Sequence, residues 1–152
     1  MTPFAGAVAQ APRVFNSAAT TETLTGLTNG TTFTFKVAAR TVFTTGLASQ
    51  PSPAIVVGAP IAPTAVTATA GIGRATVHWT APAANNGAAI TGYVVTPFVG
   101  GVAQAPRTFL STATTQTITG LTSGTAFVFR VAATNSRGTG PNSAPSNVVT
   151  AT

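Results

Sequence analysis

The stretch GLTSGTAFVFRVAATN, residues 120–135, places large apolar residues at alternate positions of its second half. Such alternation is typical of a β-strand that buries one face and exposes the other. We therefore predict a strand over residues 125–134, with Phe127, Phe129 and Val131 facing a hydrophobic core. The glycines on its N-terminal side indicate a turn that leads the chain into this strand.

Nearly the same stretch occurs earlier in the chain, as GLTNGTTFTFKVAAR at residues 26–40. A shift of 94 residues aligns the two copies without a gap, and 27 of the 38 residues from 2 to 39 are identical to their counterparts. A period of this length suits a whole small domain rather than a solenoid repeat. Met1 falls opposite Val95, inside a predicted strand, so we expect that the reading frame begins within an upstream copy of a longer array.

The second copy has the pattern of a complete all-β domain. Its short alternating runs are separated by segments rich in glycine, proline and asparagine. Seven short strands of this kind predict a β-sandwich. The predicted strands cover residues 64–70, 74–80, 90–98, 107–110, 114–121, 125–134 and 144–152, and two long loops cover residues 81–89 and 135–143.

Several segments of the second copy, taken in order, carry a family resemblance. They are ATVHW at 75–79, NNGAAITGYVV at 85–95, TITGLTSGTAFVFRVAATNSRGTGP at 117–141 and PSN at 145–147. Together they resemble the fibronectin type III domain, most closely the tandem type of secreted and cell-surface bacterial proteins. The resemblance covers residues 60–152 fully and residues 2–58 in part.

The resemblance implies a seven-stranded, immunoglobulin-like β-sandwich, in which strands A, B and E form one sheet and strands C, C′, F and G form the other. It also makes Trp79 the core residue of strand B. The expected core of the second copy comprises Val77, Trp79, Tyr93, Leu121, Phe127, Phe129 and Val131. One departure concerns Phe127, because the family usually has a tyrosine there whose hydroxyl closes the E–F corner. Loss of that hydrogen bond costs about 0.5–1.5 kcal/mol.

The first copy lacks the regions that correspond to strands A, B and C, and it contains no tryptophan. The chain then divides into a partial repeat, a linker and a complete domain, at residues 1–58, 59–63 and 64–152. Without an opposing sheet, Phe33, Phe35 and Val37 would stay exposed, which forfeits about 1.5–3 kcal/mol for each side chain. We expect residues 1–58 to be poorly packed or to borrow strands from elsewhere, for example by self-association.

Only 5% of the residues are charged, and seven Lys or Arg residues stand against one acid, giving a net charge of +6. The basic residues are scattered singly, without the cluster or stripe that follows a phosphate backbone, so nucleic acid is not an expected partner. The chain has no cysteine, no apolar run of bilayer-spanning length and no signal-peptide pattern at its N-terminus. A secreted or cell-surface location is implied by the resemblance alone.

Acid–base catalysis and metal binding both need partners that this composition does not supply. His78 is the only histidine and Glu22 the only acid, and they lie in different copies. A catalytic pair or a set of metal ligands needs two or more such groups together. We therefore expect no catalytic residue, no metal site, no cofactor and no enzymatic activity, with His78 an ordinary outward-facing residue of its strand.

The loops at 81–89 and 135–143 form the candidate ligand-contact surface, because the resemblance makes them the B–C and F–G loops at one end of the sandwich. Their candidate contact residues are Asn85, Asn86, Arg137 and Asn142. The alternative is that both loops are plain turns, since Arg137 begins Arg-Gly-Thr rather than the Arg-Gly-Asp that some family members present. Two repeated basic pairs, Arg13 with Arg107 and Lys36 with Arg130, are either solvated charges or weak contacts for an anionic polymer or glycan.

For function, the resemblance implies a non-enzymatic extracellular module of a tandem array, which spaces other domains or mediates protein interaction. The alternative is a module that binds carbohydrate or a cell-wall polymer through the B–C and F–G loops. A single tryptophan that is expected to be buried disfavours the stacking platform typical of sugar binding. The expected partners are other domains of the same protein, with protein or polysaccharide ligands left open.

Overall fold

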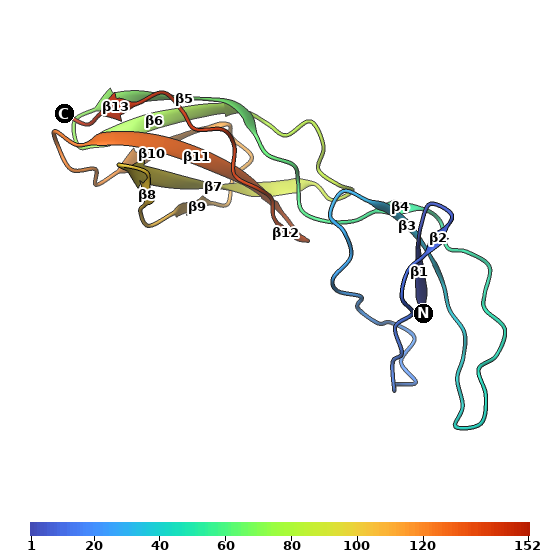
Figure 1. The fold of residues 1–152 in the computed structure, drawn as a ribbon. Coiled ribbons are helices and arrows are strands. Elements are labelled where there is room, and N and C mark those ends of the chain that lie inside the picture. The colour runs from blue at the N-terminus through green and yellow to red at the C-terminus, as the bar shows by residue number, and fades with distance from the viewer. The chain divides into compact units, whose positions relative to one another are not determined.

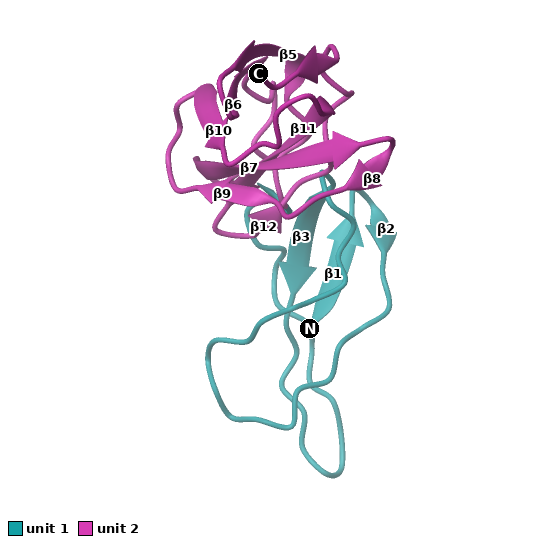
Figure 2. Ribbon diagram, turned by 90° about the vertical axis from the view of Figure 1, so that its left-hand side faces the viewer, with its two compact units in different colours: residues 1–58 teal, residues 59–152 magenta.

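The computed structural model describes residues 1–152, and all of its regular elements are β-strands. The chain forms two compact units, Met1–Gly58 and Ala59–Thr152 (Figure 1, Figure 2). Unit 1 contains β1 (Thr2–Ala5), β2 (Val8–Ala9), β3 (Thr32–Lys36) and β4 (Ile55–Val56). Unit 2 contains β5 (Thr64–Gly71), β6 (Arg74–Thr80), β7 (Ile90–Val99), β8 (Val102–Ala103), β9 (Arg107–Phe109), β10 (Thr115–Thr119), β11 (Ala126–Asn135), β12 (Gly138–Thr139) and β13 (Val149–Thr150).

Unit 2 is a sandwich of two antiparallel sheets. One sheet has the strand order β10-β6-β5, and the other has the order β12-β11-β7-β8, with β9 also paired to β7 and β13 to β11. In Figure 1, β5 and β6 lie over β11 and β7. The all-β sandwich predicted from the sequence is confirmed. Strands A, B and E correspond to β5, β6 and β10 in one layer, and strands C, C′, F and G correspond to β7, β9, β11 and β13 in the other.

The core of unit 2 lies between these two layers. Alternate residues of β6 (Ala75, Val77 and Trp79) are at most 1% exposed, whereas His78 between them is exposed. The Trp79 ring meets the Tyr93 ring edge-on, with 4.9 Å between their centroids, an arrangement that aromatic pairs favour. All seven residues that the sequence places in the core are between 0% and 9% exposed.

Two serine side chains, rather than a long last strand, close one edge of β11. The Ser143 hydroxyl accepts a hydrogen bond from the Val131 N–H at 3.0 Å, and the Ser146 hydroxyl accepts one from the Phe129 N–H at 3.0 Å. Each hydroxyl also donates to the carbonyl oxygen of the residue that follows it. The predicted strand over 144–152 is therefore regular only at β13. Before it, serine hydroxyls accept the N–H groups of β11, while the Ser143 and Ser146 N–H groups still donate to the carbonyl oxygens of β11.

Residues 59–63 form the first packed segment of unit 2 rather than a free linker. Pro60 is fully buried, and the Ile61 N–H donates to the Ala84 carbonyl oxygen at 3.1 Å. Gly140 allows this close approach, since a Cβ at that position would collide with the Pro60 carbonyl oxygen. These contacts fix the segment against the loops of the sandwich, which the sequence boundary at residue 64 did not anticipate.

Unit 1 is a single sheet with the strand order β2-β1-β3-β4. Thr2 of β1 lies opposite Lys36 of β3, as Thr96 of β7 lies opposite Arg130 of β11. The expectation that the first copy lacks all of strand C therefore needs correction, because the four residues of β1 are the end of that strand. They remain a strand because β3 supplies their pairing partner. No residue of unit 1 corresponds to β5 or β6.

Residues 20–26 of unit 1 show the effect of this missing layer. Their sequence, TTETLTG, differs from the TTQTITG of unit 2 at only two positions, yet they form no regular strand. In unit 2 the same segment forms β10, whose only partner strand is β6. Strand N–H and C=O groups need a partner, so pairing rather than local propensity decides the outcome here.

The apolar face of β3 is covered to different degrees along its length. Phe33 is 3% exposed, and its ring stacks on that of Phe35 with 6.2 Å between the centroids, while β1 and β4 pair with it on its two sides. Phe35 is only partly buried, and Val37 is 49% exposed. Their counterparts in unit 2 are both 0% exposed. The expected uncovered face is therefore found at the Phe35 end of β3 and not at Phe33.

Replacing Ser143 with alanine tests the serine contacts of unit 2. The change leaves the buried Val131 N–H without its acceptor, which we expect to lower the free energy of unfolding by about 1–3 kcal/mol. Ser123→Ala, at an exposed turn position, is the matched control and should change it by less than about 0.5 kcal/mol. Urea denaturation followed by Trp79 fluorescence measures both. Equal effects of the two substitutions would contradict the structural role of Ser143.

Candidate functional site

The loops after β6 and β11 are tied together by the residues that the sequence singled out. Asn86 is 7% exposed, has a positive φ of 53°, and donates from Nδ2 to the Ala59 carbonyl oxygen at 2.6 Å. Arg137 donates from Nη1 to the Asn86 carbonyl oxygen at 2.8 Å. The Asn85 carbonyl oxygen accepts from Asn135 Nδ2 at 2.9 Å. The structure thus brings three of the four candidate contact residues into one hydrogen-bonded network.

Asn135, which the sequence analysis did not select, holds both loops. Its Nδ2 donates to the carbonyl oxygens of Asn85 and Ala88, and its Oδ1 accepts from the Arg137 N–H at 2.8 Å. The fourth candidate, Asn142, is exposed on the segment after β12, and Arg137 is exposed as well. A buried amide that joins two loops stabilises their conformation, so this network favours fixed loops over a preformed ligand pocket.

The two side chains suited to acid–base chemistry belong to different units. His78 is exposed on β6, with its Nδ1 2.9 Å from the Thr115 hydroxyl oxygen. Glu22 lies in unit 1, among the residues that line a cavity. No three His, Cys, Asp or Glu residues gather into a potential metal site. Two hollow surfaces are therefore the remaining candidate binding sites.

The first hollow lies on the outer face of the β7–β11 sheet and has a volume of about 330 Å³. The Arg130 guanidinium lies 5.5 Å from the centroid of the Phe98 ring, and unit 1 repeats this pair with Lys36 at 5.5 Å from the Phe4 ring. Val148, which is 65% exposed, adds an apolar wall. Such a cation–ring pair contributes about 0.5–1 kcal/mol at an exposed site, and its cationic edge can still meet an anionic group.

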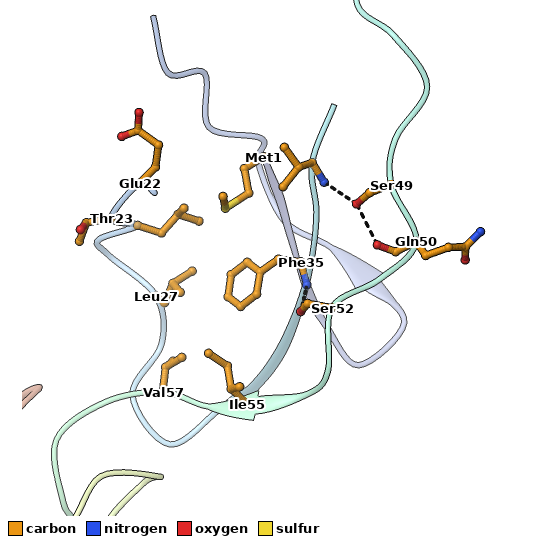
Figure 3. A pocket seen from close by; sticks show the side chains of 12 residues that line it. Met1, Glu22, Thr23, Leu27, Phe35, Ser49, Gln50, Ser52, Ile55 and Val57 are labelled. Carbon is orange, nitrogen blue, oxygen red and sulfur yellow. Dashed lines mark hydrogen bonds between the residues drawn. The ribbon is translucent and has the colours of Figure 1, made fainter. Parts of the chain in front are cut away.

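The second hollow is the open face of unit 1, with a volume of about 640 Å³. Figure 3 shows the Phe35 ring at its centre, among the apolar side chains of Met1, Leu27, Ile55 and Val57. Ser52 holds one wall in place, because its hydroxyl accepts from the Phe35 N–H at 3.0 Å. Glu22 is the only charged side chain of the lining.

The positions 94 residues later line the closed core of unit 2. Phe35 and Val37 correspond to Phe129 and Val131, which are both 0% exposed. In unit 2 these residues form one buried cluster with side chains of β5 and β6, namely Val66, Ala68, Ala75, Val77 and Trp79. The hollow of unit 1 is therefore the space that β5 and β6 fill in unit 2.

The fibronectin type III domain family matches residues 61–149, which is more than half of the chain. The chain belongs to the fibronectin type III family. The resemblance seen in the sequence is thereby confirmed for this part of the chain. Fibronectin type III domains are generally non-catalytic structural or interaction modules of multidomain proteins, and they are common in extracellular proteins.

Solved structures of similar proteins agree with this fold. The structure of titin kinase and its flanking domains is 26% identical, with a TM-score of 0.55 over 62% of this chain and 18% of that chain. A crystal structure of titin domains is 21% identical, with a TM-score of 0.58 over 99% of this chain and 54% of that chain. The chicken CNTN1 FN1-FN3 domains are 21% identical, with a TM-score of 0.52 over 82% and 44%. The chain thus spans less than two thirds of each of these proteins, and it contains no helix suited to crossing a membrane.

Asn147 is a further residue that the sequence analysis missed. Its Oδ1 accepts from the Ala68 N–H at 2.8 Å and its Nδ2 donates to the Ala68 carbonyl oxygen at 3.0 Å, so the side chain imitates a paired strand residue for β5. The position 94 residues earlier is Pro53, in the unit that has no counterpart of β5. The two serines did leave a signal, since Ser49 and Ser52 recur as Ser143 and Ser146, with Pro51 recurring as Pro145 between them.

Proposed function

We propose that the chain is a spacer of a tandem fibronectin type III array in a secreted or cell-surface protein, with the other domains of that protein as its partners. The observation that carries this proposal is that the chain enters and leaves unit 2 at opposite ends of β5. At the entry, Ala59 is bonded to Asn86 of the β6–β7 loop. At the exit, the Gly73 N–H of the β5–β6 turn donates to the Thr152 carbonyl oxygen at 2.7 Å. The eight residues of β5 span about 25 Å between these ends.

A load applied through these two ends would pull β5 against the segment that follows β12. Asn147 joins that segment to β5 through two hydrogen bonds at Ala68, and Ser143 and Ser146 join it to β11. Hydrogen bonds that lie across a load share it, whereas bonds aligned with a load break one after another. The arrangement therefore suits a module that keeps neighbouring domains apart.

Pulling the full chain by its termini in a single-molecule force experiment tests the spacer function. Unfolding of unit 2, Ala59–Thr152, should release about 300 Å of contour length in one step, at about 3.5 Å per residue less the folded length. Asn147→Ala should lower the unfolding force, because both bonds to β5 are lost. Asn142→Ala, at an exposed position, is the matched control and should leave the force unchanged. A wild-type chain without a resolvable force peak, or an unchanged unfolding force in the Asn147 variant, would contradict the proposal.

The second candidate function is binding of a polysaccharide or cell-wall polymer. The outer-face hollow favours it more than the B–C and F–G loops do, because the side chains of Asn86 and Asn135 in those loops are already bonded to Ala59 and Asn85. A repetitive polymer with anionic groups could meet the same cation–ring pair in each unit, formed by Arg130 in unit 2 and Lys36 in unit 1.

Retention of the chain on peptidoglycan, whose peptides carry carboxylates, tests this second function, with the uncharged polymers chitin and cellulose as comparisons. If it operates, Arg130→Gln should weaken retention about two- to fivefold, as expected for the loss of one exposed cationic contact. Arg74→Gln, an exposed arginine outside the hollow, provides the comparison and should be retained like the wild type. Absence of retention on all three polymers, or equal retention of the two variants, would remove polymer binding from consideration.

A further inference from the structure

We propose that the open face of unit 1 is a docking site for a β-hairpin of another fibronectin type III segment, a strand pair of the β5–β6 kind. The face lies around Phe35 and Val37 and encloses about 640 Å³. This proposal goes beyond the spacer function and rests only on the fold of unit 1. Its failure would therefore leave the spacer function of unit 2 untouched.

Unit 2 shows which structure complements this face. The residues that line the hollow lie 94 positions before residues that β5 and β6 cover in unit 2. Five of them are identical to their counterparts, namely Leu27, Phe35, Val37, Ser49 and Ser52. In unit 2 the covering side chains alternate along two strands, as Val66 and Ala68 on β5 and as Ala75, Val77 and Trp79 on β6. A hairpin with this alternation presents the volume and the apolar surface that the hollow lacks.

Backbone pairing supplies a second element of recognition. Residues 21–25 correspond to β10, which in unit 2 pairs with β6 over its whole length. In unit 1 these residues form no regular strand. A docked strand of the β6 kind would give them the same ladder. Main-chain hydrogen bonds would then provide affinity, and the pocket around Phe35 would provide specificity, as in other cases of strand addition.

Backbone pairing also distinguishes this occupant from a second copy of the same face. Two such faces packed against each other would offer residues 21–25 no strand of the β6 kind, so the ladder that β10 makes in unit 2 would not form. Charge does not select between the two occupants, because the hollow is lined both by Glu22 and by Met1, which carries the N-terminal ammonium group. The separate hairpin is therefore the favoured occupant.

A labelled peptide with the sequence of residues 59–81 tests the proposal when the full chain is titrated into it and fluorescence anisotropy is recorded. Saturable binding is expected. Val37→Asp should weaken binding about tenfold or more, because it places a carboxylate in the apolar hollow at a position exposed enough to tolerate it. Val42→Asp, 91% exposed and outside the hollow, is the matched control and should bind like the wild type. A peptide that carries Val77→Asp should not bind.

The proposal is overturned if the peptide does not bind saturably, or if the Val37 and Val42 variants bind it equally well. Light scattering on the chain without peptide decides between the two occupants. A dimer that Val37→Asp abolishes and Val42→Asp preserves would show that a second copy covers the face, which also overturns the proposal. A monomeric chain whose peptide binding depends on Val37 supports it.

Discussion

Burial of one apolar layer against another is the constraint on which both units depend. In unit 2, Trp79 of β6 lies between the sheets and meets Tyr93 edge-on, and each large side chain buried around it contributes about 1.5–3 kcal/mol. In unit 1, β3 keeps both phenylalanines of the corresponding part of β11 but has no facing layer, and only a single sheet forms. The segment at 20–26 stays irregular although its sequence forms β10 in unit 2. A strand-forming sequence thus becomes a strand where a neighbouring strand pairs with it, and its apolar side chains become buried where a second layer faces it.

Side-chain hydrogen bonds complete what this burial begins. Ser143 and Ser146 hold the chain after β12 against β11, and Asn147 holds it against β5, so a segment with little regular structure still joins the two sheets. At the opposite end, Asn135 fixes the loops after β6 and β11. These contacts make unit 2 a closed module, which supports the proposed spacer function. Unit 1 keeps the corresponding serines but has an open inner face, where we propose that a hairpin docks.

Features with a sequence period were predictable, and features that depend on a single side chain were not. Alternation placed the second predicted strand at 74–80, the bounds of β6, and another at 125–134, one residue from β11. The expected strand at 144–152 is regular only at β13. The sequence did not indicate this, because a serine hydroxyl that accepts a backbone N–H leaves no periodic pattern. The loop asparagines were noticed as candidate ligand contacts, yet only the fold shows that Asn86 bonds to Ala59. The two-residue strand β4, which pairs with Thr32 and Phe33 in unit 1, is too short for any pattern to reveal.

Amide hydrogen exchange on the full chain tests the central claim most directly, because Phe35 and Phe129 provide an internal comparison. Both N–H groups donate to a serine hydroxyl at 3.0 Å, so their local hydrogen bonds are alike and only the facing layer differs. If layer closure controls stability, the Phe129 amide should exchange only through global unfolding of unit 2, and the Phe35 amide at least about 100-fold faster. Equal protection of the two amides in the monomeric chain would contradict the account.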